Sequence, residues 1–295
     1  MMSVSSAGGR LPQISAGRKR KDRIMRGTLM VGTGVALVPL ILVIYYLLYK
    51  GLSSWSGSFF STDPTGNFFG NPGGIRSAIF GTLEIVGLAS LLAIPIGIAV
   101  ALYLTEYGKE GWFANLVRYF VDVMTGVPSV VFGLFIYIVL VISHAGGSGF
   151  AGWKGSLALA LLMLPIVIRS SEVVLLLVPG SLREAALALG APRWRIVWRV
   201  VLPTARSGLV TGSLLAVARG MGETAPLLFT VSLATAATAN LNGLMNSLPL
   251  QIYTDVTSPR DVIVSRAWGA ALTLVALVLI LNVIARLISR RSSMA

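Results

Sequence analysis

The sequence predicts an all-α, polytopic integral membrane protein with six transmembrane helices. Of its 295 residues, 55% are hydrophobic and only 12% are charged, which leaves too little charge to cover a soluble domain of this size. A membrane-spanning helix needs about 20 predominantly apolar residues, because the hydrocarbon core is about 30 Å thick. Four stretches meet this need without a charged side chain, and two more contain one Arg and one Glu each: 27–49, 85–105, 123–143 and 267–285, then 155–178 and 207–235.

The first span, residues 27–49, follows a segment rich in Ser, Gly, Arg and Lys. Its apolar run is longer than the hydrophobic region of a signal peptide, and no small-residue cleavage pattern follows it. We therefore expect a retained signal anchor. Residues 1–26 are expected to form a mobile, basic, cytoplasmic tail against the anionic inner leaflet.

The distribution of positive charge orients the spans. With the N-terminus inside, most of the 24 lysines and arginines fall in the N-terminal tail, the second and fourth loops and the C-terminal tail. This positive-inside pattern predicts that both termini are cytoplasmic. The formal net charge of +13 therefore reflects topology and contact with membrane lipid, and it does not indicate a nucleic-acid partner. The cations expected on the outer side are Lys50, Arg76, Lys154, Arg260 and Arg266.

The sequence patterns in span three and in the expected outer loops predict local structure only. Pro128 is expected to kink span three, and Gly126 and Gly133 lie seven residues apart, on one helix face that favours close packing. The loop 50–76 is rich in aromatic residues and suits the membrane interface. The polar segment 236–262 is expected to be partly re-entrant.

The fourth loop, residues 179–203, predicts a short capped helix. Ser181 followed three residues later by Glu184 has the form of a capping box, so a helix is expected over 182–189. Gly190 suits a left-handed helix end, and Pro192 stops the helix from continuing. An isolated helix of this length is marginal in water, so it needs packing support. Its own membrane domain or a groove on a partner protein could provide that support.

This loop resembles the EAA loop of ABC-importer permeases with the MetI-like, type I fold. The residues that carry the resemblance are Glu184, Ala185 and Ala186, then Gly190, then Val200, Val201, Leu202 and Pro203, with Val200 where the family usually has Ile. In that family the short helix docks into a cleft on a cytoplasmic ATPase subunit. The resemblance therefore implies a five-helix permease core over 77–289 and coupling to an ATPase. The residues expected to serve that coupling are Arg183, Glu184, Ala185, Ala186, Gly190, Leu202 and Pro203.

The chain has no nucleotide-binding loop of its own. The Gly108-Lys109 pair is followed by Glu110 and lacks the preceding glycine of a phosphate-binding loop, and the sequence contains no cysteine. We expect no catalytic residue, no metal site and no cofactor in this chain. ATP and Mg²⁺ are expected on the partner ATPase, so the chain itself is not an enzyme.

Two pairs of ionisable residues lie within predicted spans. Arg169 precedes Glu172 by three residues, and Arg219 precedes Glu223 by four, so each pair can meet on one helix face. They are either structural ion pairs or anion contacts along a transport path, since a guanidinium fork matches an oxyanion. Glu84 and Asp122 are expected to be structural.

The stretch from Arg219 to Thr230, which contains Gly222, Glu223, Thr224, Ala225 and Pro226, is similar to span five of phosphate-importer permeases. This resemblance implies phosphate import across a bacterial plasma membrane, with Arg169, Arg219, Glu172, Glu223 and Thr224 on the path. It also implies a second permease (PstC-type), two ATPase subunits (PstB-type) and an extracytoplasmic phosphate-binding protein (PstS-type). An importer of sulfate, molybdate or phosphonate remains an alternative, as does a transporter driven by an ion gradient.

Overall fold

The computed structural model describes residues 16–65, 71–108, 111–147 and 149–293. It consists of two compact units, residues 1–49 and 50–295. The first unit contains most of helix α1 (Ala16–Leu52), which includes the predicted first span. Lys109, Glu110 and residues 1–15 of the expected tail lie outside the described residues.

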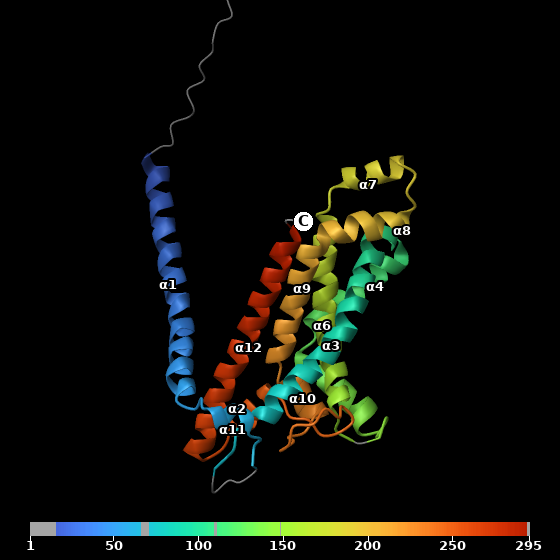
Figure 1. Ribbon diagram of the computed structural model, residues 1–295. Helices are drawn as coiled ribbons and strands as arrows, with labels where there is room; N and C mark the ends of the chain where they lie inside the picture. The colour runs from blue at the N-terminus through green and yellow to red at the C-terminus, as the bar shows by residue number, and fades with distance from the viewer. Residues whose placement is uncertain (1–15, 66–70, 109–110, 148, 294–295) are drawn as a thin grey trace, which may run out of the picture. The chain divides into compact units, whose positions relative to one another are not determined.

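Residues 16–26 of the expected tail form the first turns of α1 (Figure 1). Arg and Lys are good helix formers, and extending an existing helix avoids the cost of nucleation. The basic segment therefore continues the apolar span as one helix.

The second unit is a helical bundle. Its long helices are α3 (Arg76–Leu102), α6 (Gly152–Leu176), α9 (Leu202–Gly222) and α12 (Asp261–Ser293). A π-helical segment, η1 (Tyr103–Gly108), continues α3. Among the described residues, five helices including α1 are long and apolar enough to cross a membrane, and a bent pair brings the number to six. The predicted all-α, six-span architecture is confirmed.

Span three is broken and not merely kinked. Helix α4 (Trp112–Gly126) and the following pair, α5 (Ser129–Ile136) and η2 (Tyr137–Val141), meet at an angle of 102°. Pro128 is extended, with φ −57° and ψ 138°, and its ring excludes the helical hydrogen bond at this point. The predicted fifth span, 207–235, is also interrupted, because α9 ends at Gly222 and the short helix α10 (Ala225–Thr230) follows.

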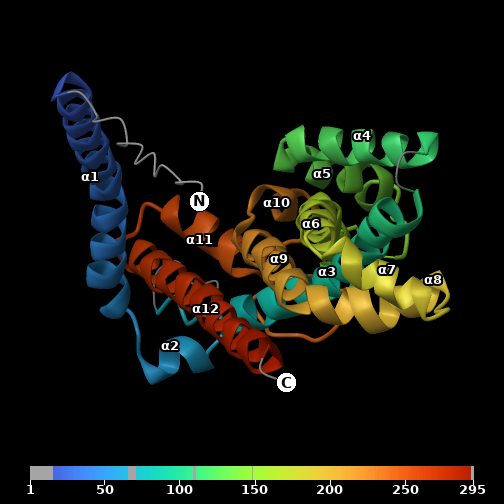
Figure 2. The same cartoon turned by 90° about the horizontal axis from the view of Figure 1, so that it is seen from above.

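Helix α6 forms the centre of the bundle. It packs against α3, α4, α5, α9 and α10, and Figure 2 shows it end-on among these helices. The largest buried cluster lies between α3, α6 and α9 and includes Ile85, Leu159, Met163, Val167 and Met221. Helix α6 therefore connects most of the helices of the bundle.

The two ends of the bundle differ in structure. One end carries α7 (Gly180–Ala188), α8 (Arg193–Ile196) and η3 (Val197–Val201), and α12 ends on the same side (Figure 1). The opposite end carries α2 (Gly57–Ser61), α10 and α11 (Leu248–Val256). The segment expected to be partly re-entrant thus contains a helix, α11, whose residues pack against α12 and α3.

Candidate functional site

Helix α7 lies where the sequence predicts a short helix, but it begins differently. The predicted capping box is wrong: the helix starts at Gly180, and its N-cap, Pro179, makes no side-chain cap hydrogen bond. Pro179 holds the extended conformation that enters the helix, so Ser181 already lies in the first turn. The predicted C-terminus is confirmed, because Gly190 has φ +76°, which an L side chain rarely adopts.

Helix α7 is supported on one side only. None of its residues, all of which the structure describes, is fully buried, and Ala186 is half-buried against a cluster that includes Leu175 and Val201. Glu184 and Ala185 are exposed, as is Leu187, whose side chain is 52% exposed. The helix therefore presents a largely unburied small and apolar surface outside the bundle.

Arg183 attaches α7 to the membrane bundle. Its guanidinium donates to Glu106 on η1 at 2.8 and 3.1 Å, and to the carbonyl oxygens of Val178 and Leu175 at 2.7 and 2.9 Å. Leu175 lies in the last turn of α6, where orphan carbonyls need donors, and Val178 lies two residues after the helix ends. Arg183 thus faces inward and links α7 to two spans. Of the other predicted coupling residues, Leu202 is half-buried and Pro203 exposed, both in the first turn of α9.

A cavity of about 580 Å³ lies between η1, α7 and α8. Its polar lining residues include Glu106, Arg118, Arg183, Glu184 and Arg193. The cavity leaves α7 without continuous packing against the bundle.

Glu172 is the buried centre of a charge cluster shared by α4 and α6. Its carboxylate, with the side chain 8% exposed, accepts from Arg118 at 2.9 Å and from Arg169 at 2.7 Å. Arg169 also contacts Asp122 on α4. The predicted Arg169–Glu172 pair is confirmed as a contact, and Asp122 joins it as the structural expectation suggested. The cluster ties α4 to α6, so much of Arg169's donor capacity is already occupied.

Arg169 nevertheless borders open space. A groove of about 620 Å³ runs between α6 and α9, lined by Arg169, Ser170, Val173, Val174, Ser207, Gly208, Thr211 and Gly212. The arginine side chain is 32% exposed, and several neighbours carry hydroxyl groups. An anion in this groove would meet polar donors on a face of the bundle.

Arg219 differs from Arg169 in its surroundings. Its Nε lies 3.4 Å from Glu223, its side chain is 59% exposed, and the carboxylate is 16% exposed. The predicted pair is thus present but weak, because water screens an exposed ion pair. Glu223 is extended at the end of α9, and Thr224 begins the turn into α10. The break places Arg219, Glu223 and Thr224 together where the helix is interrupted.

The two broken spans support each other. A Cβ at Gly133 would lie 2.6 Å from Cα of Pro226, which is backbone and cannot rotate away. Gly133 on α5 therefore lets α10 approach closely, which confirms the packing expectation at this position. A Cβ at Gly126 would meet nothing within 4 Å, so the expectation finds no contact there within the described residues.

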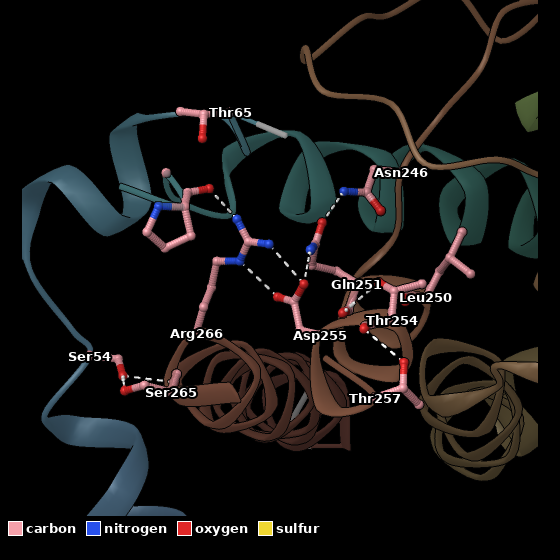
Figure 3. Close-up of polar contacts among 12 residues, drawn as sticks. Ser54, Thr65, Asn246, Leu250, Gln251, Thr254, Asp255, Thr257, Ser265 and Arg266 are labelled. Atoms are coloured by element: carbon pink, nitrogen blue, oxygen red, sulfur yellow. Dashed lines mark hydrogen bonds and ion pairs between the residues drawn. The ribbon is translucent and has the colours of Figure 1, made fainter. Parts of the chain in front are cut away.

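A second buried polar cluster, at the opposite end of the bundle, was missed by sequence reasoning (Figure 3). Arg266 on α12 donates to both oxygens of Asp255 on α11, at 2.7 and 2.8 Å, and also to the carbonyl oxygen of Pro72. Gln251 links Asp255 to Asn246 at 2.7 and 2.6 Å. The sequence pattern that could have indicated this cluster is the spacing of Gln251 and Asp255, which lie four residues apart on one helix face.

Two cations assigned to the outer side are buried. Arg266 is 9% exposed, and Lys154 is fully buried, with its Nζ donating to the carbonyl oxygens of Leu140 and Gly149 at 2.9 and 3.0 Å. Burial is tolerated because each cation finds oxygen partners. Lys154 thus fastens the end of broken span three to the start of span four.

An ion pair connects the loop before α3 to the start of α3, and a backbone hydrogen bond connects it to the segment after α10. Arg76 donates to Asp63 at 3.1 and 2.7 Å, and the backbone N–H of Ala237 donates to the same carboxylate at 3.3 Å. The hydrogen bond from Arg76 holds the pKa of Asp63 below its ordinary value, although burial opposes this effect.

The fold and these features define a permease subunit of an ABC importer. Residues 93–294 match the family described as the binding-protein-dependent transport system inner membrane component. Solved structures give the same fold: a bacterial alginate ABC transporter matches with a TM-score of 0.67 and 17% identity, covering 92% of this chain and 96% of that one. The MetNI methionine ABC transporter matches with a TM-score of 0.61 and 19% identity, covering 73% and 94%.

Curated relatives narrow the class. The phosphate transport system permease protein PstA of Haemophilus influenzae is 39% identical over 92% of this chain and 94% of its own length. PstA of Yersinia pestis is 40% identical over 92% and 91%, and PstA 1 of Mycobacterium tuberculosis strain H37Rv is 38% identical over 92% and 88%. The chain belongs to the binding-protein-dependent transport inner membrane component family, among the PstA-type permeases. It is a multi-pass membrane protein and a transport subunit.

Proposed function

We propose that this chain moves inorganic phosphate into the cytoplasm as one permease of an ATP-driven importer. The observation that carries the proposal is its likeness, over nearly its whole length, to relatives named for phosphate transport. The arginines within its spans suit an oxyanion, because a guanidinium fork donates two parallel hydrogen bonds to phosphate oxygens.

In this proposal α7 receives the motion of the ATPase subunits. A PstB-type ATPase subunit receives the exposed surface around Glu184 and Ala185, Ala186 supports that surface from the bundle side, and Gly190 sets the turn that follows. Arg183 contributes to the coupling from the side of α7 that faces the bundle, because it joins α7 to η1 and to the end of α6. Leu202 and Pro203 carry the motion into α9. ATP and Mg²⁺ bind to the ATPase, and this chain performs no chemistry.

The phosphate path follows the opened faces of α6 and α9. Arg219 is the principal anion contact, because its exposed guanidinium has only a weak carboxylate partner. Glu223 and Thr224 complete the polar break, and Glu223 keeps the anion from binding too tightly to leave. Arg169 borders the groove, but its guanidinium already contacts Glu172 and Asp122. Its main role in this proposal is therefore to position α4 on α6.

In this proposal the chain lies in the inner membrane of a bacterium, with α7 and both termini on the cytoplasmic side. Positive charge on the inner loops supports this assignment. The rest of the complex comprises a PstC-type permease, which supplies the other wall of the path, a second PstB-type subunit and an extracytoplasmic PstS-type phosphate-binding protein.

The test measures phosphate uptake by proteoliposomes that contain the assembled complex. ATP is enclosed in the vesicles, and labelled phosphate and the binding protein are added outside. Arg219→Gln should lower uptake at least tenfold, since one charge-assisted contact is worth about 1.5–3 kcal/mol, while the complex still assembles. Arg26→Gln removes one positive charge from α1 and should leave uptake unchanged. Unaltered uptake in Arg219→Gln, or loss of assembly, would count against the anion contact.

Competition separates the rival cargoes. Excess unlabelled phosphate should suppress uptake, whereas sulfate, molybdate and phosphonate should not. Suppression by sulfate at lower concentration than phosphate would end the substrate assignment. Uptake that follows an imposed ion gradient without ATP would favour a gradient-driven transporter.

A further inference from the structure

The segment from Arg193 to Arg206 gathers four exposed arginines within 14 residues. Elsewhere in the second unit, Arg76, Arg118, Arg169, Arg183, Arg219 and Arg266 each lie against a carboxylate. Within the described residues, Arg193, Arg195, Arg199 and Arg206 are exposed and have no ion-pair partner. The segment itself contains no acidic residue. Its positive charge is therefore available to an external anion.

Two tryptophans accompany these arginines. Trp194 is 58% exposed and Trp198 is 68% exposed, and their spacing of four residues puts them on one face of α8 and η3. The guanidinium carbon of Arg195 lies 5.4 Å from the ring centre of Trp194, so the aromatic and cationic stripes adjoin. The opposite face is apolar and packed, with Ile196 and Val197 each 5% exposed.

The position of this surface suits the membrane boundary. Figure 1 shows α8 and η3 lying across the end of the bundle before the chain turns into α9, with α7 further out. Arg206 lies on the first turns of α9, just before the apolar stretch that begins at residue 207. Exposed tryptophan prefers the headgroup region, where its ring lies in apolar surroundings and its N–H stays hydrated.

We propose that α8 and η3 bind the phosphate headgroup of an anionic lipid of the cytoplasmic leaflet, such as phosphatidylglycerol. Arg195 and Arg199, four residues apart, donate to the lipid phosphate, while Trp194 and Trp198 lie between the headgroups and fix the depth of the helix. The cytoplasmic assignment rests on the proposed function. The lipid anchors the segment between α7 and α9, so that motion of α7 tilts α9 about a fixed point.

A lipid fits this surface better than a protein partner. Helix α7 projects beyond α8, so a docking ATPase meets α7 first (Figure 1). The surface of α8 combines positive charge with two large, exposed indole rings, which match an anionic headgroup layer. A free phosphate ion would need the arginines but not the tryptophans.

The test uses the absence of cysteine in this chain. Thr204→Cys, at an exposed position after η3, carries a fluorophore in the assembled complex in nanodiscs. Quenching by headgroup-labelled phosphatidylglycerol is compared with quenching by equally labelled phosphatidylcholine. The readout needs neither nucleotide nor transport, so it stands or falls independently of the proposed phosphate import.

We expect preferential quenching by phosphatidylglycerol. Arg195→Gln with Arg199→Gln should reduce this preference by about 25-fold, from roughly 1 kcal/mol per cation near an anionic surface. Replacing both arginines by Lys keeps the charge and should retain most of the preference, which also shows that the segment folds. Lys19→Gln with Arg20→Gln, on α1, removes the same charge and should leave the quenching unchanged.

Several results would overturn the proposal. The first is equal quenching by phosphatidylglycerol and phosphatidylcholine. The second is a preference for phosphatidylglycerol that survives in the double Gln variant of Arg195 and Arg199. The third is an equal loss of that preference in the control variant of Lys19 and Arg20. A probe that neither lipid reaches would assign the surface to a partner protein. Displacement of phosphatidylglycerol by millimolar inorganic phosphate would assign it to the free ion.

Discussion

Replacing Glu172 by Gln tests whether the charge cluster around this residue holds α4 against α6. The substitution keeps the shape of the side chain but removes the charge that Arg118 and Arg169 share at 2.9 and 2.7 Å. Removing one member of a fully buried ion pair costs about 3–5 kcal/mol. Here the arginines are 29% and 32% exposed, and Arg169 keeps its contact with Asp122. We therefore expect a loss of about 2 kcal/mol in the free energy of unfolding, after discounting for solvent.

The assay is detergent-induced unfolding of the assembled complex, followed by intrinsic tryptophan fluorescence. Glu172→Gln is measured alone and together with Arg118→Gln, because a double-mutant cycle isolates the interaction between the two side chains. The coupling energy should be about 1–2 kcal/mol. Glu223→Gln is the matched control and should shift unfolding by less than about 0.5 kcal/mol, since its partner Arg219 is mostly exposed.

Two outcomes would refute this reasoning. The first is a coupling energy near zero between Glu172 and Arg118, which would mean that the cluster contributes no net stability. The second is equal destabilisation by Glu172→Gln and Glu223→Gln, which would mean that burial does not distinguish the two pairs.

Three further predictions concern backbone contacts and the outer ion pair. Gly133→Ala should lower the unfolding midpoint, at a cost of about 1–3 kcal/mol, because its Cβ meets the backbone of Pro226, whereas Gly126→Ala should have no effect; equal effects would contradict the packing of α5 on α10. Gly190→Ala should cost about 1–2 kcal/mol at φ +76° and lower the phosphate moved per ATP, and unchanged coupling would argue against the role of this turn. Asp63→Asn should destabilise the loop before α3 by about 0.5 kcal/mol at pH 7 in a proteolysis assay. A folded-state pKa below the unfolded value of about 3.9 stabilises the folded protein above that value, and this stabilisation is lost as the pH falls through the lower folded-state pKa. The difference should therefore shrink steadily as the pH falls below about 3.9, and a pH-independent difference would count against the ion pair.

Features set by local sequence could be predicted. The six spans follow from apolar composition, and the left-handed turn at Gly190 follows from a glycine placed before a proline. The contact between Arg169 and Glu172 follows from helical spacing. Each depends on residues within a few positions of one another, where propensity and periodicity decide the outcome.

Features set by distant contacts could not be predicted. Arg266 looks like a loop cation in the sequence, yet it reaches Pro72, which is 194 residues away in the chain. Arg118 looks like an ordinary cytoplasmic charge, yet its partner Glu172 lies 54 residues on. The 102° break at Pro128 exceeds what a proline alone predicts, because the packing of Gly133 against α10 determines where the second half goes.

The contact between α7 and an ATPase subunit is tested most directly by cross-linking. Ala185 is exposed on α7, and the chain has no native cysteine, so Ala185→Cys provides one defined attachment point. In membranes that contain the whole complex, a short bifunctional reagent should join this position to the ATPase subunit and stop phosphate uptake, and cleavage of the linker should restore it. Continued uptake after complete cross-linking, or adducts formed with lipid or this chain alone, would contradict the account.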